Sequence, residues 1–468
     1  MPEAPLARLF ASAAGGITLL SCLLLLAAIF LSPATFLHDF GEWVFQGKIL
    51  SLKFAAPEQV TAYTLYNYPV PYSTAQYFLA LLHLVFPPLL AGKILIAMYI
   101  VGWCAAAEMF CRRYFDEPTQ RRLAWVILVC LAAFSSFFYY GYIGYQLGLL
   151  LLVAFLAFYH AATSPLMIGI FGVVLFFTHA TIFLQFGLLV FLGVALNRFP
   201  LRQLMALLPC VFLGLAFLAG RFLADSVPLP VQSNWDGWLE AAIYKAGMVT
   251  MQGPFKNFAF ASGATLLEDY PTLYWSGVVI NAGTALLLGL LFLRVFWRVF
   301  SGGLLFEGRS EPTRVFCVFL LGMSALYLLA PYNFLGLVHP AGRVILPLMV
   351  VLLALTPVAG VRFSGLAVSV LALSTLVTSA AYFKAVTSYD SLADLASEVP
   401  SSPPAELASS VMAYNQWLYR NTRYSYYNYR VFVLKHRYDQ LQAEDYRGLG
   451  FRSGPIADYQ TTDRLPGR

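Results

Sequence analysis

The chain has 468 residues, of which 60% are hydrophobic and only 11% charged, and its mean hydropathy is +0.71. Soluble globular proteins carry about 25% charged residues, so the composition excludes that class and predicts an all-α polytopic membrane protein. The net charge of +6 comes mostly from arginines in short loops. Such loops carry information on membrane topology, and they do not form the basic patch of a nucleic-acid-binding protein.

Apolar runs recur along the whole chain, and a membrane-spanning helix needs about 20 such residues. We expect about eleven spans, which would put the two termini on opposite sides of the membrane. The short run 73–86 ends at two prolines, and we interpret it as an interfacial or half-membrane helix. The expected spans are 9–31, 89–111, 123–140, 145–163, 165–179, 181–197, 203–223, 273–297, 314–332, 343–360 and 364–382.

Arginines cluster in four loops that all fall on the cytoplasmic side if the first span runs outward. We therefore expect a cytoplasmic N-terminus and an extracytoplasmic C-terminus. The polar, tyrosine-rich C-terminal region is expected to form a small α/β or irregular unit with a disordered tail near 452–468. The expected domains are a transmembrane domain at 1–382, with outer loops 32–88, 224–272 and 332–342, and the C-terminal region at 383–468.

The first outer loop begins with HDFGEW, which places Asp39 and Glu42 one helical turn apart just outside the membrane. A carboxylate in this position can serve as general base toward a lipid-bound substrate, with the second one orienting the acceptor. The alternative is a capping box, with Asp39 as the N-cap of a short helix and Glu42 as its partner.

Four basic side chains lie where a departing phosphate would need positive charge or hydrogen-bond donors: Lys93, His179, His339 and Arg343. His179 lies between two short apolar runs, where we expect either a break between two helices at the outer surface or a single bent helix, and Arg343 begins a late span. The alternatives are a histidine satisfied by a neighbouring carbonyl and an arginine that reaches toward lipid headgroups.

Other catalytic signatures are missing from the sequence. The six cysteines are scattered without CxxC spacing, so they predict neither disulfides nor a metal cluster. There is no P-loop, no GxGxxG after a strand, no HExxH and no GxSxG, which argues against ATP hydrolysis and nicotinamide chemistry.

Five segments carry a family resemblance through their order along the chain. They are HDFGEW, NYPVPYSTAQYFLALLHLV, AGKILIAMYIVG, THATIFLQFGLLVFL and GRVILPLMVVLLAL, within residues 9–360. Together they resemble bacterial members of the GT-C superfamily of integral membrane glycosyltransferases. The resemblance implies a bacterial inner-membrane enzyme that moves a sugar from a polyprenyl-phosphate donor to an extracytoplasmic glycan, lipid or protein.

By the same resemblance Asp39 is the general base, and His38, Tyr68 and Tyr72 join the substrate-binding residues. The turn 137–146 lacks the paired carboxylates that many members carry in the second outer loop. We therefore predict no metal site, and we leave a requirement for a divalent cation open. Membrane lipids are the other expected partners. Two further classes stay open: a transporter or flippase for a lipid-linked saccharide, and a non-catalytic membrane scaffold.

Overall fold

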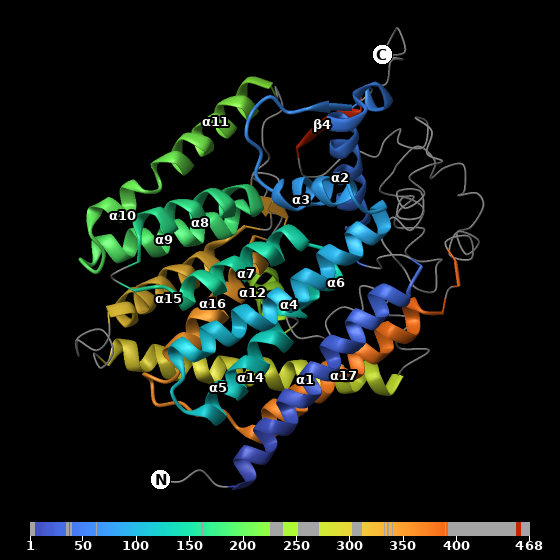
Figure 1. Cartoon of the computed structure of the whole chain (residues 1–468). Helices are drawn as coiled ribbons and strands as arrows, with labels where there is room; N and C mark the ends of the chain where they lie inside the picture. Colours follow the sequence, from blue (N-terminus) through green and yellow to red (C-terminus); the bar gives the residue numbers. More distant parts are fainter. Residues whose placement is uncertain are drawn as a thin grey trace.

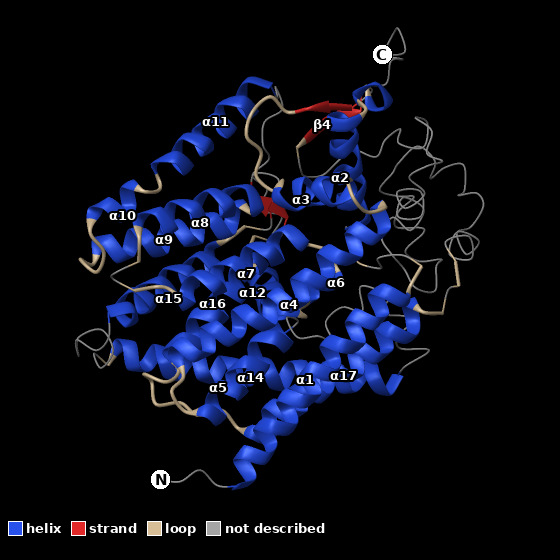
Figure 2. Cartoon of the chain, in the orientation of Figure 1, coloured by secondary structure: helices blue, strands red, loops and turns tan. Residues whose placement is uncertain are grey.

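The computed structural model is a bundle of α-helices with two pairs of very short strands (Figures 1 and 2). It describes residues 5–33, 37, 40–61, 63–160, 163–224, 237–250, 271–301, 311–331, 333–334, 337–338, 340–388, 390–391 and 455–459. Most of the C-terminal region expected at 383–468 therefore lies outside the described residues.

The described elements follow in chain order. They are α1 (Pro5–Leu31), α2 (Phe40–Ala55), η1 (Pro57–Val60), β1 (Tyr63–Leu65), α3 (Thr74–His83), α4 (Pro88–Tyr114), α5 (Pro118–Leu128), η2 (Val129–Ala133), α6 (Ser136–Tyr139), α7 (Ile143–Ala157), α8 (Pro165–Thr178), α9 (Ala180–Ala195), α10 (Leu201–Met205), α11 (Leu208–Ala224), α12 (Trp238–Thr250), α14 (Pro271–Phe300), α15 (Glu311–Leu329), β2 (Asn333–Phe334), β3 (Leu337–Val338), α16 (Gly342–Leu355), α17 (Gly365–Val386) and β4 (Ile456–Tyr459).

Several helices begin at a proline, which tolerates the first helical position because the N–H that it lacks would have no partner there. Pro88, Pro118 and Pro165 begin α4, α5 and α8 in this way. Within the described residues, seven helical segments are long and apolar enough to cross a membrane, and α7, α8, α9 and α16 are shorter apolar helices. An all-α membrane protein is thus supported, while the expected count of eleven spans stays a prediction.

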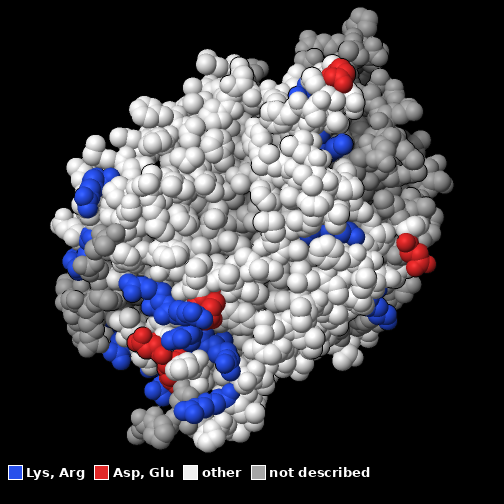
Figure 3. All heavy atoms as spheres, in the orientation of Figure 1, with Lys and Arg blue, Asp and Glu red and all other residues white. Residues whose placement is uncertain are grey.

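Three of the four arginine-rich regions meet at one end of the bundle. The start of α5 and the α16–α17 loop are joined by two hydrogen bonds between Gln120 and Phe363, and Arg294 of α14 donates to the carbonyl of Gly360. The start of α17 packs against Phe10, so α1 begins at this same end. Figure 3 shows Lys and Arg side chains gathered there. We call it the basic end.

The break predicted between two short apolar runs is confirmed. Helix α8 ends at Thr178 and α9 begins at Ala180, with the extended residue His179 between them. The two helices lie side by side as a hairpin (Figure 1). The run 73–86 forms the ten-residue helix α3, too short to span a membrane, as expected.

The C-terminal strand β4 pairs antiparallel with β1 of the first outer loop, with Tyr63 opposite Tyr459 and Leu65 opposite Ile456. The predicted disorder of the tail is therefore wrong for 456–459. This segment gains order from a partner strand almost 400 residues away in sequence, which local composition does not reveal. The pairing also places the C-terminal strand beside the loop that follows α1.

Candidate functional site

Arg343 lies in the first turn of α16, at the end of the bundle opposite the basic end. Its guanidinium carbon lies 4.5 Å from the ring centre of Tyr142, 5.2 Å from that of Tyr145 and 5.3 Å from that of Phe137. These rings attract the cation through their π faces and limit its rotation. Among the described residues no carboxylate pairs with this arginine.

Two side chains hold the backbone of Arg343 in place. Tyr145 Oη and Gln185 Nε2 both donate to the Arg343 carbonyl, each at 3.2 Å. Two buried polar atoms beside this carbonyl have no hydrogen-bond partner within the described chain: Arg343 Nε, a donor, and Gln185 Oε1, an acceptor. Buried groups of this kind are normally paired, so the site lacks one acceptor and one donor that a ligand can supply.

His179 joins the same cluster from the α8–α9 break. Its ring meets Tyr72 edge-on at 4.6 Å and Tyr145 at 5.2 Å, and its Nδ1 is hydrogen-bonded to Thr181 Oγ1 at 2.8 Å. Two glycines of α7 allow the close approach of this break. A Cβ on Gly144 would lie 3.2 Å from the Thr178 carbonyl oxygen, and one on Gly148 would lie 3.1 Å from the His179 Cβ. These glycines have the four-residue spacing common where membrane helices pack closely.

Tyr72 reaches the cluster from the first outer loop in an unusual conformation. Its φ is +67°, a left-handed value that is strained for a bulky residue. The next residues bind the break: Ser73 N–H donates to the Phe177 carbonyl at 2.8 Å, and Thr74 and Thr178 share a hydroxyl hydrogen bond at 3.1 Å. Burial raises the pKa of Tyr72, with the charge of Arg343 partly opposing the shift, so its hydroxyl stays protonated and able to donate.

Four helices begin at this cluster, so their positive ends converge on it, and the negative end of α8 at Thr178 opposes only one of them. Tyr142 precedes α7, His179 precedes α9, Ser73 precedes α3 and Ala341 precedes α16, and none of these positions supplies a side-chain cap. A helix N-terminus carries roughly half a positive charge and unpaired N–H groups. Together with Arg343, which pairs with no carboxylate among the described residues, this arrangement favours an anion, and the cluster is the candidate anion site.

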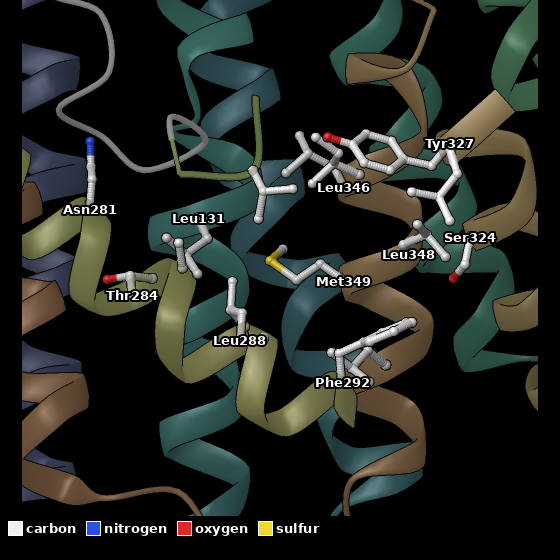
Figure 4. A pocket seen from close by; sticks show the side chains of 16 residues that line it. Leu131, Asn281, Thr284, Leu288, Phe292, Ser324, Tyr327, Leu346, Leu348 and Met349 are labelled. Atoms are coloured by element: carbon white, nitrogen blue, oxygen red, sulfur yellow. The ribbon is translucent and has the colours of Figure 1, made fainter. Parts of the chain in front are cut away.

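An apolar cavity of about 280 Å³ lies along the same helix α16 (Figure 4). Its α16 wall begins at Ile345, and its other walls are mainly α14 and α15, with Val249 of α12 and Leu131 of η2. Figure 4 shows Leu346, Met349 and Leu288 around it. Asn281 Oδ1 at its margin is buried and has no partner among the described residues. The cavity suits a hydrocarbon chain that carries few polar groups.

Of the residues predicted for the site, Tyr72, His179 and Arg343 come together. Tyr68 lies apart, against α11, and Lys93 Nζ donates to the carbonyls of Phe30 (3.2 Å) and Ser32 (2.6 Å) at the end of α1. His38, Asp39 and His339 lie outside the described residues.

Glu42 lies in the first turn of α2 and accepts a hydrogen bond from Gln46 Nε2 at 3.2 Å. Trp43, the next residue of α2, packs against Gly144 of α7, which also faces the break. A Cβ on Gly144 would come within 2.8 Å of the Trp43 ring. The first turn of α2, which directly follows Asp39, is thereby placed beside the cluster.

Tyr142, Tyr145 and Gln185 belong to the cluster but were not singled out from sequence. All three lie in or next to apolar runs, where a polar side chain inside a span is itself a functional signal. For Gln185 that rule gives a signal in the sequence, but not the partner that assigns it to this cluster.

The described residues contain no group of three or more His, Cys, Asp or Glu side chains arranged to hold a metal ion. The chain matches no protein-family model, no curated protein and no solved structure. Its function is therefore argued from the chemistry of this cluster.

Proposed function

We propose that this protein is a membrane glycosyltransferase that takes a sugar from a polyprenyl-phosphate donor and transfers it to an extracytoplasmic acceptor. The observation that carries the proposal is a pair of buried atoms without a hydrogen-bond partner among the described residues, Arg343 Nε and Gln185 Oε1, at the meeting point of four helix N-termini. A sugar phosphate supplies both missing partners. Its phosphate oxygens accept from Arg343, and a sugar hydroxyl donates to Gln185.

Part of the donor's lipid chain can occupy the apolar cavity. Leu346, three residues after Arg343 and on nearly the same face of α16, lines this cavity, and we propose that the hydrocarbon chain of a donor whose phosphate lies at the guanidinium extends into it. A phosphate with a short polar head and a long apolar chain is the ligand class that combines these two environments.

The reaction needs little from the protein beyond positioning and charge. The acceptor hydroxyl oxygen bonds to the anomeric carbon, the bond from that carbon to the phosphate oxygen breaks, and the phosphate leaves as an anion held by Arg343. The proton of the hydroxyl passes to a base, for which we propose Asp39, directly before α2. Tyr72 stays protonated and donates to the departing phosphate.

The orientation in the membrane is part of the proposal. With the basic end in the cytoplasm, the cluster and the β1–β4 pair face the extracytoplasmic side, as expected for a bacterial inner-membrane enzyme. A C-terminal alkaline phosphatase fusion is expected to be active and a C-terminal green fluorescent protein fusion dark. The reverse pattern would contradict this orientation.

The test of the function is turnover of a polyprenyl-phosphate sugar by the purified protein, with native mass spectrometry to follow bound lipid. We expect the wild type to release polyprenyl phosphate, and Asp39→Asn to bind the donor without turnover. Full turnover by Asp39→Asn would exclude the proposed base. Movement of intact donor across vesicles without cleavage would instead identify a flippase.

A further inference from the structure

Tyr72 ends a segment, residues 63–72, that we call the gate segment. It contains β1 and has no helix to hold its shape. A strained residue such as Tyr72 keeps its conformation only when its surroundings fix it from several sides. Three anchors along the gate segment provide this restraint.

The first anchor is the C-terminal strand β4. Tyr66 N–H donates to the Pro455 carbonyl at 3.0 Å, and the side chain of Ile456 is 2% exposed. Ile456 packs with Phe45 and Ile49 of α2, with Val60 of η1 and with Tyr63 of the gate segment. A strand from the far end of the chain thus fastens the gate segment to α2.

The second anchor is Tyr68, whose ring lies against α11. Its ring centre is 6.1 Å from that of Phe217, and a Cβ on Gly220 would lie 2.3 Å from the Tyr68 Cγ. Only glycine leaves room for this contact. The third anchor is the end of the gate segment itself, where Ser73 N–H is bound to the Phe177 carbonyl.

We propose that β4 is a clasp that holds the gate segment closed over the Arg343 cluster, and that its release lets Tyr72 leave the cluster. Pro69 and Pro71 fix two φ angles between Tyr66 and Tyr72, which limits the freedom of the intervening chain, so release of β1 from β4 also loosens Tyr72. Release of the clasp therefore opens access to the anion site. That the gate admits a polyprenyl-phosphate donor rests on the proposed function, whereas the clasp itself does not.

The test is hydrogen exchange of the full-length protein, resolved to single amides, without any ligand. Tyr66 N–H reports on the clasp, and Ser73 N–H reports on the far end of the gate segment. Ile456→Asp places a charge among buried apolar side chains, and we expect the exchange rate to rise at least tenfold at both amides. Ile456→Val is the matched control and should change neither. Faster exchange at Tyr66 with unchanged exchange at Ser73 would overturn the proposal.

A second variant keeps the test valid if Ile456→Asp does not fold. Gly220→Ala crowds Tyr68 without touching β4, and we expect faster exchange at Ser73 while Tyr66 stays protected. Binding of polyprenyl phosphate then tests the gate separately from the proposed function. A gate predicts that Ile456→Asp raises both the association and the dissociation rate. If the wild type does not bind this probe, the proposed function fails while the exchange result still decides the clasp.

Discussion

Replacing Arg343 with glutamine should weaken binding of a lipid phosphate and leave binding of the uncharged lipid unchanged. The variant loses the only charge that the cluster's side chains supply within the described chain, but the four helix N-termini remain. A hydrogen bond to a charged group contributes about 1.5–3 kcal/mol, so the affinity should fall by about 10- to 150-fold. The backbone should keep its place, because the carbonyl of residue 343 is held by Tyr145 and Gln185.

The assay compares polyprenyl phosphate with polyprenol of the same chain length, in nanodiscs, for Arg343→Gln and for the control Arg362→Gln at the basic end. Arg343→Lys should be intermediate, because it keeps the charge but gives up the planar contact with three aromatic rings, which is worth about 0.5–2 kcal/mol. Equal losses for phosphate and alcohol in Arg343→Gln, or no loss at all, would refute the assignment of an anion site.

Three further substitutions test the structure around the site. Gly144→Ala should lower stability by about 1–3 kcal/mol, because its Cβ would lie 2.8 Å from the Trp43 ring. The control Gly187→Ala, with open space around it, should not lower stability. Equal melting temperatures for the two variants would contradict this packing. Lys93→Met should lower the melting temperature, because two carbonyls at the end of α1 lose their hydrogen-bond donor. The affinity for polyprenyl phosphate should not change. A selective loss of that affinity would give Lys93 a role in binding. Burial lowers the pKa of His83 from 6.5 to about 4, so the unfolded state takes up a proton first and the folded protein loses stability as pH falls from 6.5 to 4. His83→Gln should flatten this decline in stability. An unchanged pH profile would argue against a buried neutral imidazole.

Features set by local sequence could be predicted, and features set by packing could not. Apolar runs of helical length follow from composition alone, and the break at His179 follows from the lengths of the two runs that flank it. The strand β4 could not be predicted, because its order comes from contacts with Phe45 and Ile49 in a distant part of the chain.

The candidate site could be predicted from the sequence only in part, because packing also decides which residues come together there. Arg343 and His179 stand out because ionisable residues at the edge of apolar runs are costly and rarely placed there without a role. Gln185 is less conspicuous, because nothing in the sequence tells which face of α9 meets α16. The contact with the Arg343 carbonyl is what assigns it to the cluster.

The pairing of β1 with β4 also has a consequence for biosynthesis. The ribosome makes the gate segment almost 400 residues before its clasp, so the partner strand is missing while the spans between them are inserted. At roughly 5–20 residues per second, this interval is on the order of a minute. Until then Phe45, Ile49, Val60 and Tyr63 lack the Ile456 side chain that covers them in the finished protein. A protein truncated near its C-terminus would remain in that unclasped state permanently.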